Sequence, residues 1–147
     1  MRTIAQHHAQ ALKQWFLRYG EEVMNAHDFD LAARKYWDAN FSNPYAEGFE
    51  PGVRGMMEQI EPFVEAFPDV RFDVEDLLVE EHKIAVRMMV KGTHKTPFMG
   101  IPPSGREVHF PMVAFFEVGE NGRLTAVYPV VDWLTAFGQI GQFPTQS

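Results

Sequence analysis

The stretch FVEAFPDVRFDVE (residues 63–75) contains the point at which the hydrophobic period of this sequence changes. Before Pro68, apolar residues recur every three or four positions over residues 53–67, which places them on one face of a helix. After Pro68, apolar and charged residues alternate over residues 70–75, which is the period of a half-buried strand. We therefore expect helices before this proline and strands after it.

Two helices are predicted near the N-terminus. Thr3 and Gln6 have the spacing of a capping box, and the helix that they begin should fade near Asn25. Asp28 is suited to cap a short second helix that ends at Trp37.

A third helix is predicted over residues 53–67, after a loop at residues 40–51 that is punctuated by proline and glycine. Pro62 lies inside this helix and lacks the backbone N–H that helical hydrogen bonding requires. We therefore expect a kink or a split at Pro62.

The second half of the chain predicts a meander of antiparallel strands. Alternating apolar residues occupy four runs, at residues 70–74, 84–90, 108–116 and 124–130. Asn121-Gly122, between the last two runs, is a strong hairpin signal, whereas residues 97–105 contain too much proline and glycine for regular structure. Helices followed by such a meander predict a single α+β domain over residues 1–147, with helices on one face of the sheet and a loose tail at residues 142–147.

The opposite face of the predicted sheet is also apolar. Val113 and Phe115 on one strand, and Val127, Pro129 and Val131 on the next, have the parity opposite to the expected core residues. A sheet that is apolar on both faces requires a second cover, so we expect a homodimer formed through this face.

The composition excludes several classes of function. The 147 residues include 13 Lys and Arg against 20 Asp and Glu, and this net charge of −7 disfavours nucleic acid and an acidic membrane surface as partners. Cysteine is absent, which excludes disulfides and thiolate metal sites. Neither an apolar leader at residues 1–10 nor a run long enough to span a bilayer is present, so we expect a soluble, cytoplasmic protein.

Asp132 and His94 are the candidate catalytic residues. Strand parity places Asp132 on the same side as the even-numbered residues 124–130, and His94 on the inner side of the run at residues 84–90. A carboxyl group on an apolar wall has a raised pKa and can exchange a proton near neutrality. The alternatives are that Asp132 caps the segment that starts at Trp133 or pairs with an arginine, and that His94 is a rim residue.

Other polar motifs give no support to a metal or nucleotide cofactor. His7 and His8 are adjacent and lack the four-residue spacing of a helical metal pair, and no phosphate-binding loop is present. Trp15, Tyr19 and Met57 provide apolar surface on the predicted helices. They are either plain core residues or contacts to a ligand in a space between helices and sheet.

Five segments together resemble the SnoaL-like polyketide cyclases, which belong to the nuclear-transport-factor-two-like superfamily. They are Phe67–Phe72, Gly92–His94, Pro97–Arg106, Val131-Asp132 and Gln139–Gly141. The resemblance implies a cone-shaped fold in which three helices pack on a strongly curved sheet around a deep pocket. It also implies an intramolecular aldol closure of an aromatic polyketide ester, run without a cofactor by an acidic residue near the end of the last strand.

The resemblance makes Asp132 the general base and acid. For an enzyme of this kind we assign His94 and Tyr128 as hydrogen-bond donors to an enolate and Asn43 as a polar contact at the pocket mouth. Trp15, Tyr19 and Met57 would then contact the substrate. Cyclisation, isomerisation and dehydration of a small hydrophobic carbonyl compound all use this chemistry. The alternative is a dimeric module that binds a small apolar ligand or a partner protein without catalysis. Such cyclases often carry histidines at or beside the positions of Asn43 and Ala114 in this chain. The absence of these histidines favours the binding module.

Overall fold

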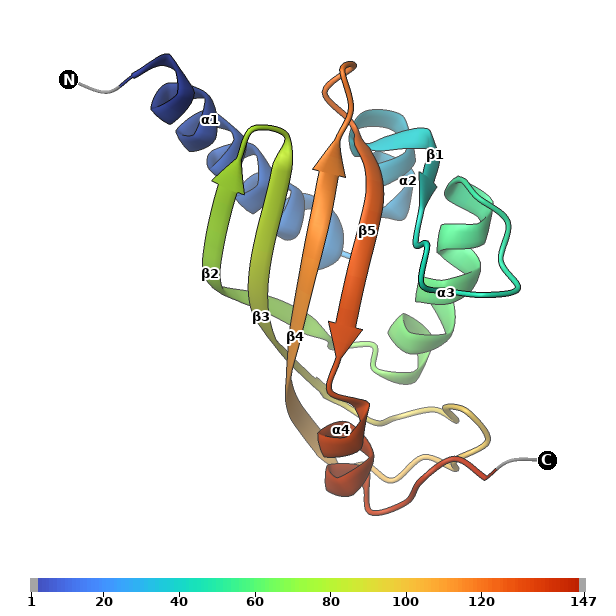
Figure 1. The fold of residues 1–147 in the computed structure, drawn as a ribbon. Helices are drawn as coiled ribbons and strands as arrows, with labels where there is room; N and C mark the ends of the chain where they lie inside the picture. Colours follow the sequence, from blue (N-terminus) through green and yellow to red (C-terminus); the bar gives the residue numbers. More distant parts are fainter. Residues whose placement is uncertain (1–2, 146–147) are drawn as a thin grey trace.

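A computed structural model describes residues 3–145 of the chain (Figure 1). Its elements in chain order are α1 (Ile4–Tyr19), the π-helical turn η1 (Gly20–Met24), α2 (Phe29–Leu31), the π-helical turn η2 (Ala32–Tyr36), β1 (Trp37–Ser42), α3 (Val53–Ala66), β2 (Arg71–Glu80), β3 (Lys83–Thr93), β4 (Glu107–Val118), β5 (Leu124–Val131) and α4 (Trp133–Ile140). Among the described residues, no helix has the length and apolar character that a bilayer-spanning segment needs.

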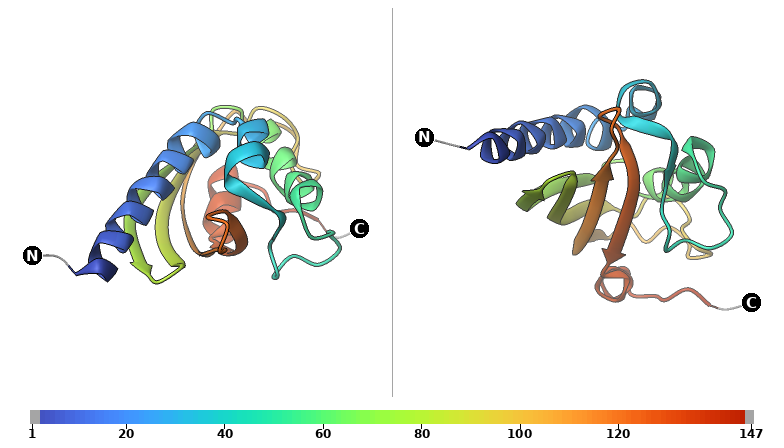
Figure 2. Two further views of the ribbon diagram at one scale, coloured as in Figure 1. Left: turned by 90° about the horizontal axis from the view of Figure 1, so that it is seen from above. Right: turned by 45° about the horizontal axis from the view of Figure 1, so that its top comes forward.

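The five strands form one curled sheet in the order β1-β5-β4-β3-β2. All neighbouring pairs are antiparallel except β1 and β5, which are parallel. Figure 2 shows α1, α2 and α3 along one side of this sheet, while α4 follows the end of β5. The expected α+β fold, with helices on a strongly curved and mainly antiparallel sheet, is therefore confirmed.

The predicted helix starts are confirmed by their capping bonds. The Thr3 hydroxyl accepts a hydrogen bond from the Gln6 backbone N–H at 3.2 Å, and the Gln6 side chain accepts one from the Thr3 N–H at 2.8 Å. The Asp28 carboxylate accepts from the Leu31 N–H at 3.1 Å. Each bond satisfies an N–H that the first turn of a helix leaves free.

The strand β1 was not predicted. Trp37 and Phe41 are its two fully buried residues, and their four-residue spacing resembles that of a helix rather than a strand. The strand forms because β5, some 85 positions further along the chain, provides its hydrogen-bonding partners, with a register shift between Trp37 and Ser42. Local sequence pattern carries no information about such a partner.

Pro62 does not split the third helix. The helix α3 runs as a single element from Val53 to Ala66 with this proline inside it. Proline removes one N–H, but packing of the apolar residues on both sides of it against the core holds the helix together.

A bulge near Thr125 reverses the predicted orientation of β5. Val118 pairs with Leu124, but Glu117 pairs with Ala126, so Thr125 is an extra residue on β5. One inserted residue moves every later side chain to the opposite face. Residues 126–131 therefore have the inverse of the predicted parity, and this part of the prediction is wrong.

The consequence of the bulge is an exchange of residues between the two faces. Val127, Pro129 and Val131, which were expected on the outer face, line a pocket on the inner face. Tyr128 and Val130 lie on the outer face, and Val130 is 61% exposed. Val113 and Phe115, by contrast, are exposed as predicted.

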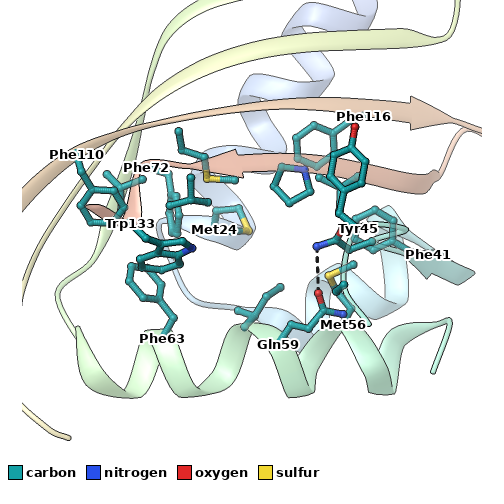
Figure 3. Close-up of a pocket in the computed structure, with 18 of the residues that line it drawn as sticks. Met24, Phe41, Tyr45, Met56, Gln59, Phe63, Phe72, Phe110, Phe116 and Trp133 are labelled. Atoms are coloured by element: carbon teal, nitrogen blue, oxygen red, sulfur yellow. Dashed lines mark hydrogen bonds between the residues drawn. The ribbon is translucent and has the colours of Figure 1, made fainter. Parts of the chain in front are cut away.

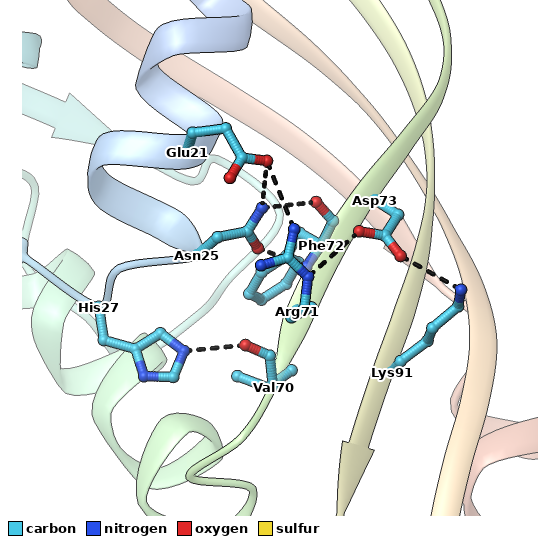
Figure 4. Close-up of polar contacts among 8 residues, drawn as sticks. All are labelled: Glu21, Asn25, His27, Val70, Arg71, Phe72, Asp73 and Lys91. Atoms are coloured by element: carbon cyan, nitrogen blue, oxygen red, sulfur yellow. Dashed lines mark hydrogen bonds and ion pairs between the residues drawn. The ribbon is translucent and has the colours of Figure 1, made fainter.

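The turn after η1 covers the free edge of β2, as Figure 4 shows. The Asn25 side chain donates to the Phe72 carbonyl at 3.2 Å and accepts from the Phe72 N–H at 2.7 Å, as a neighbouring strand would. The His27 ring contacts the Val70 carbonyl at 2.9 Å, and Arg71 pairs with Glu21 at 3.5 Å. These contacts fix η1 and the turn after it against the start of β2 and occupy the Phe72 backbone groups with which another strand would pair.

Candidate functional site

A cavity of about 470 Å³ lies between α3 and the inner face of the sheet. Figure 3 shows side chains from both layers converging on it. Its lining consists of Tyr19, Met24, Phe41, Asn43, Tyr45, Ala46, Met56, Gln59, Ile60, Phe63, Phe72, Val90, Phe110, Met112, Phe116, Val127, Pro129, Val131 and Trp133. Within the described chain, no Asp, Glu, Lys, Arg or His borders this cavity.

Helical and strand periodicity together produce this lining. On α3, Met56, Gln59, Ile60 and Phe63 are three or four residues apart and therefore share the face that points toward the sheet. On β5, alternate residues from Val127 onward point back toward α3. The shape of the cavity therefore depends on the bulge in β5.

Asn43 and Gln59 are the two side-chain amides of the lining. The Tyr45 N–H donates to Asn43 Oδ1 at 3.0 Å, Asn43 Nδ2 donates to Gln59 Oε1 at 3.2 Å, and Gln59 Nε2 donates to the Gly55 carbonyl at 3.1 Å. We call this chain of three hydrogen bonds the amide relay. It begins at the Tyr45 N–H, which can only donate, and ends at the Gly55 carbonyl, which can only accept. The orientation of both side-chain amides is therefore fixed by the backbone.

Asp132 is the N-cap of α4. Its carboxylate accepts hydrogen bonds from the Thr135 hydroxyl at 2.7 Å and from the Thr135 N–H at 3.0 Å. These bonds, the hydroxyl bond first, hold the pKa of Asp132 below its ordinary value and outweigh the effect of burial. The expected raised pKa is therefore wrong, as is the expected place in the cavity wall. Among the alternatives, the helix cap is the one that the geometry matches.

His94 is fully buried but does not line the cavity either. Its Nδ1 accepts a hydrogen bond from the Ser104 N–H at 3.2 Å and lies 2.9 Å from the Ser104 hydroxyl, and its ring stacks on Phe67. Burial lowers the pKa of His94, which favours the neutral ring that this acceptor role requires. His94 therefore ties the loop at residues 97–105 to the core, and the prediction that it shares a cavity wall with Asp132 is wrong.

Tyr19 and Asn43 line the cavity, in agreement with their predicted place. Tyr19 accepts a hydrogen bond from the buried Trp37 indole N–H at 3.0 Å, and burial raises the pKa of its hydroxyl. It is thus a neutral wall residue whose hydroxyl oxygen is already engaged. Asn43 is the only one of the predicted substrate-binding residues with an amide toward the cavity.

The other three predicted substrate-binding residues lie outside the cavity lining. Trp15 packs on the rings of Tyr19 and Tyr36, and Met57 packs against the core from the next position after a lining residue. Tyr128 faces outward because of the bulge, although its ring contacts the ring of Tyr45 with centroids 5.4 Å apart. It reaches the cavity only through that second tyrosine.

Gln59 and Trp133 are site residues that sequence reasoning missed. Gln59 is a polar residue within the apolar stripe of α3, and that interruption is a signal that could have identified it. Trp133 directly follows Asp132, but only the start of α4 turns its ring toward the cavity. Within residues 3–145, no cluster of three or more metal-binding side chains is present.

Residues 15–140 match the family model described as SnoaL-like polyketide cyclase. This match spans most of the sequence, and the chain therefore belongs to the SnoaL-like polyketide cyclase family.

Solved structures agree with this assignment. The chain is 25% identical to TsrD from Streptomyces laurentii, with a TM-score of 0.75 over 91% of this chain and 95% of that one. It is 26% identical to a SnoaL-like polyketide cyclase from Agrobacterium tumefaciens strain C58, with a TM-score of 0.71 over 86% and 94%. A protein from Jannaschia sp. CCS1, provisionally named as such a cyclase, shares the fold at 23% identity, with a TM-score of 0.80 over 98% and 99%. No curated protein matches this chain.

The buried His94 generates a prediction about pH. Because its folded-state pKa is depressed, the unfolded chain binds more protons just below pH 6.5, the ordinary pKa of histidine. The stabilising contribution of neutral His94 is therefore complete above pH 6.5 and is lost as the pH falls through the folded-state pKa. We expect His94→Asn, whose Oδ1 can still accept from Ser104, to reduce the pH dependence of the free energy of unfolding between about pH 7.5 and about pH 5.5.

Urea unfolding of both proteins at several pH values measures this effect. Equal pH dependence in the original chain and in His94→Asn would show that His94 is not the titrating group.

Proposed function

We propose that this chain binds a small, neutral and largely hydrophobic molecule in the cavity between α3 and the sheet. The observation that carries the proposal is the lining, which is almost wholly apolar and, in the described chain, contains no ionisable acid, base or cation apart from tyrosine hydroxyls. A charged ligand would lose its hydration there without gaining a partner of opposite charge. A cavity of about 470 Å³ has the size of typical small-molecule sites.

The amide pair supplies the polar contact for such a ligand. Each side-chain NH₂ of Asn43 and Gln59 donates one hydrogen within the relay and keeps one free. A carbonyl or ether oxygen is the complementary ligand group. Membership of a family described by polyketide cyclisation supports a carbonyl compound as the ligand.

Catalysis on the bound molecule is a second candidate, favoured by the family and by the position of Asp132. This residue lies between Val131 and Trp133, and both of these line the cavity. In that candidate, Asp132 acts as base and acid in a cofactor-independent aldol cyclisation, isomerisation or dehydration. Its two hydrogen bonds with Thr135 and its lowered pKa make it a weak base, which is why we place binding first.

A homodimer through the outer face of the sheet is also proposed, with a corrected set of residues. Val113 is paired with Val130, and Phe115 with Tyr128, so these four side chains form a continuous patch across β4 and β5. We call it the outer-face patch. Val113, Phe115 and Val130 are 44%, 58% and 61% exposed, and burial of such a patch favours self-association.

Two substitutions at neighbouring positions of β4 test the binding proposal. Met112 lines the cavity and Val113 points to the opposite face, so Met112→Trp should fill the cavity whereas Val113→Trp should leave it open. With the neutral fluorescent probe N-phenyl-1-naphthylamine, we expect saturable binding to the original chain. Met112→Trp should weaken it about 10-fold or more, and Val113→Trp should leave it unchanged. Absence of saturable binding, or equal losses in both variants, would contradict the proposal.

Asp132→Asn separates binding from catalysis. Asparagine caps helices as well as aspartate does and keeps an oxygen for the Thr135 N–H, so the fold should be preserved. We expect the affinity for the naphthylamine probe to stay the same. If the catalytic candidate is correct, turnover of a cyclisable carbonyl substrate should fall about 100-fold or more in this variant, while unchanged turnover would remove Asp132 from the mechanism.

Sedimentation tests the dimer. We expect the original chain to sediment at twice its 16.9 kDa mass at micromolar concentration, and Phe115→Glu to sediment as a monomer because it places a charge in the outer-face patch. Leu134→Glu, at an exposed leucine of α4, is the matched control and should remain dimeric. A monomeric original chain would refute the proposed dimer.

A further inference from the structure

We infer that the cavity selects flat, neutral molecules with a hydrogen-bond acceptor at each of two ends. The Asn43–Gln59 amide pair donates to the acceptor at one end of the ligand, and the indole N–H of Trp133 donates to the acceptor at the other end. This inference rests on the proposed function and adds to it the chemical class of the ligand. Figure 3 shows Trp133 and Gln59 on opposite sides of the cavity.

The amide end presents two free donors. Asn43 Oδ1 already accepts from the Tyr45 N–H, and Gln59 Oε1 already accepts from Asn43. The two remaining hydrogens, one on each NH₂, have no partner among the described residues. Because the relay is anchored on backbone groups at both ends, neither amide can turn over to present its oxygen without breaking a hydrogen bond.

Trp133 supplies the donor at the other end. Its ring is held among four phenylalanines, with centroid distances of 5.6 Å to Phe63, 5.7 Å to Phe98, 5.7 Å to Phe110 and 5.9 Å to Phe137. Over residues 3–145, no protein acceptor takes the indole N–H. Figure 3 shows this nitrogen on the side of the ring that faces the cavity. Trp133 is 36% exposed, so a ligand oxygen at this N–H takes the place of solvent and gives the indole a protein–ligand hydrogen bond.

The rest of the lining is mainly apolar, and its other polar side-chain groups are the hydroxyls of Tyr19 and Tyr45. Met24, Ile60, Phe72 and Met112 are among the apolar residues of the lining. The Tyr19 hydroxyl is already engaged, since it accepts from the Trp37 indole and contacts Met24 Sδ at 3.5 Å. The amide hydrogens and the Trp133 indole N–H are free donors, so a ligand with two carbonyl or ether oxygens satisfies donors at both ends.

Three naphthalenes of matched shape test the inference. They are 2,6-diacetylnaphthalene with two acceptors, 2-acetyl-6-isopropylnaphthalene with one, and 2,6-diisopropylnaphthalene with none. Because an isopropyl group replaces an acetyl group with little change of shape, the series varies hydrogen bonding more than size. By equilibrium dialysis, we expect the diacetyl compound to bind about 3- to 10-fold more tightly than the monoacetyl compound for the second hydrogen bond.

Variants at each end identify the donors. In Trp133→Phe, which keeps an aromatic ring but removes the N–H, the diacetyl compound should bind no more tightly than the monoacetyl compound. Gln59→Met should also reduce the advantage of the diacetyl compound. Trp15→Phe is the matched control, because Trp15 lies outside the lining, and it should change nothing. Unchanged affinity for 2,6-diisopropylnaphthalene in all variants would verify that the cavity is intact.

The outcomes distinguish this inference from the proposed function. If all three naphthalenes bind the original chain equally, the cavity binds hydrophobic molecules but gains nothing from hydrogen bonds to two acceptors. Only this inference is then overturned. The same holds if Trp133→Phe weakens all three compounds alike. If none of them binds, the proposed function fails together with the inference.

Discussion

The extra residue at Thr125 is the constraint on which both faces of the sheet depend. It turns Val127, Pro129 and Val131 toward α3, where they close the apolar cavity, and it turns Tyr128 and Val130 outward, where they extend the outer-face patch. Without the bulge, the side chains of β5 that now point to the inner face would point to the outer face, and the reverse. The Asp132 side chain would then point to the inner face, as the alternation of the sequence predicts. The bulge thus determines which chemical groups face the ligand space.

The resulting cavity is lined mainly by apolar side chains, and its polar groups are the amides of Asn43 and Gln59, the Trp133 indole N–H and the hydroxyls of Tyr19 and Tyr45. Three charged or titratable side chains outside the lining have structural contacts: Asp132 caps α4, His94 fixes the loop at residues 97–105, and Arg71 pairs with Glu21 of η1. A hydrogen bond is stronger in an apolar space than in water. In the proposed function, the free amide and indole donors are therefore the main polar contacts to the ligand. The chain belongs to a cyclase family, but within the described residues its cavity lining has no acid, base or cation apart from tyrosine hydroxyls, and for this reason we propose binding ahead of proton transfer.

Local signals in the sequence predicted the local parts of this structure. The capping pair Thr3 and Gln6, the N-cap Asp28 and the hairpin at Asn121-Gly122 are decided by neighbouring residues, and each is found where expected. The strand β1 and the bulge in β5 depend on pairing between distant segments, which alternation along one segment cannot reveal. That is why the fold class was predicted correctly, while Tyr128 was assigned to the wrong face and Gln59 and Trp133 were missed.

Methionine methyl groups offer the most direct test of the central claim, that a neutral hydrophobic ligand occupies this cavity. Met24, Met56 and Met112 line it, whereas Met57, Met89 and Met99 do not. In a chain with ¹³C-labelled methionine methyls, titration with 2-acetylnaphthalene should shift the NMR signals of the first three and leave those of the other three in place. Shifts confined to Met57, Met89 or Met99, or no saturable shift at any of the six, would contradict the account.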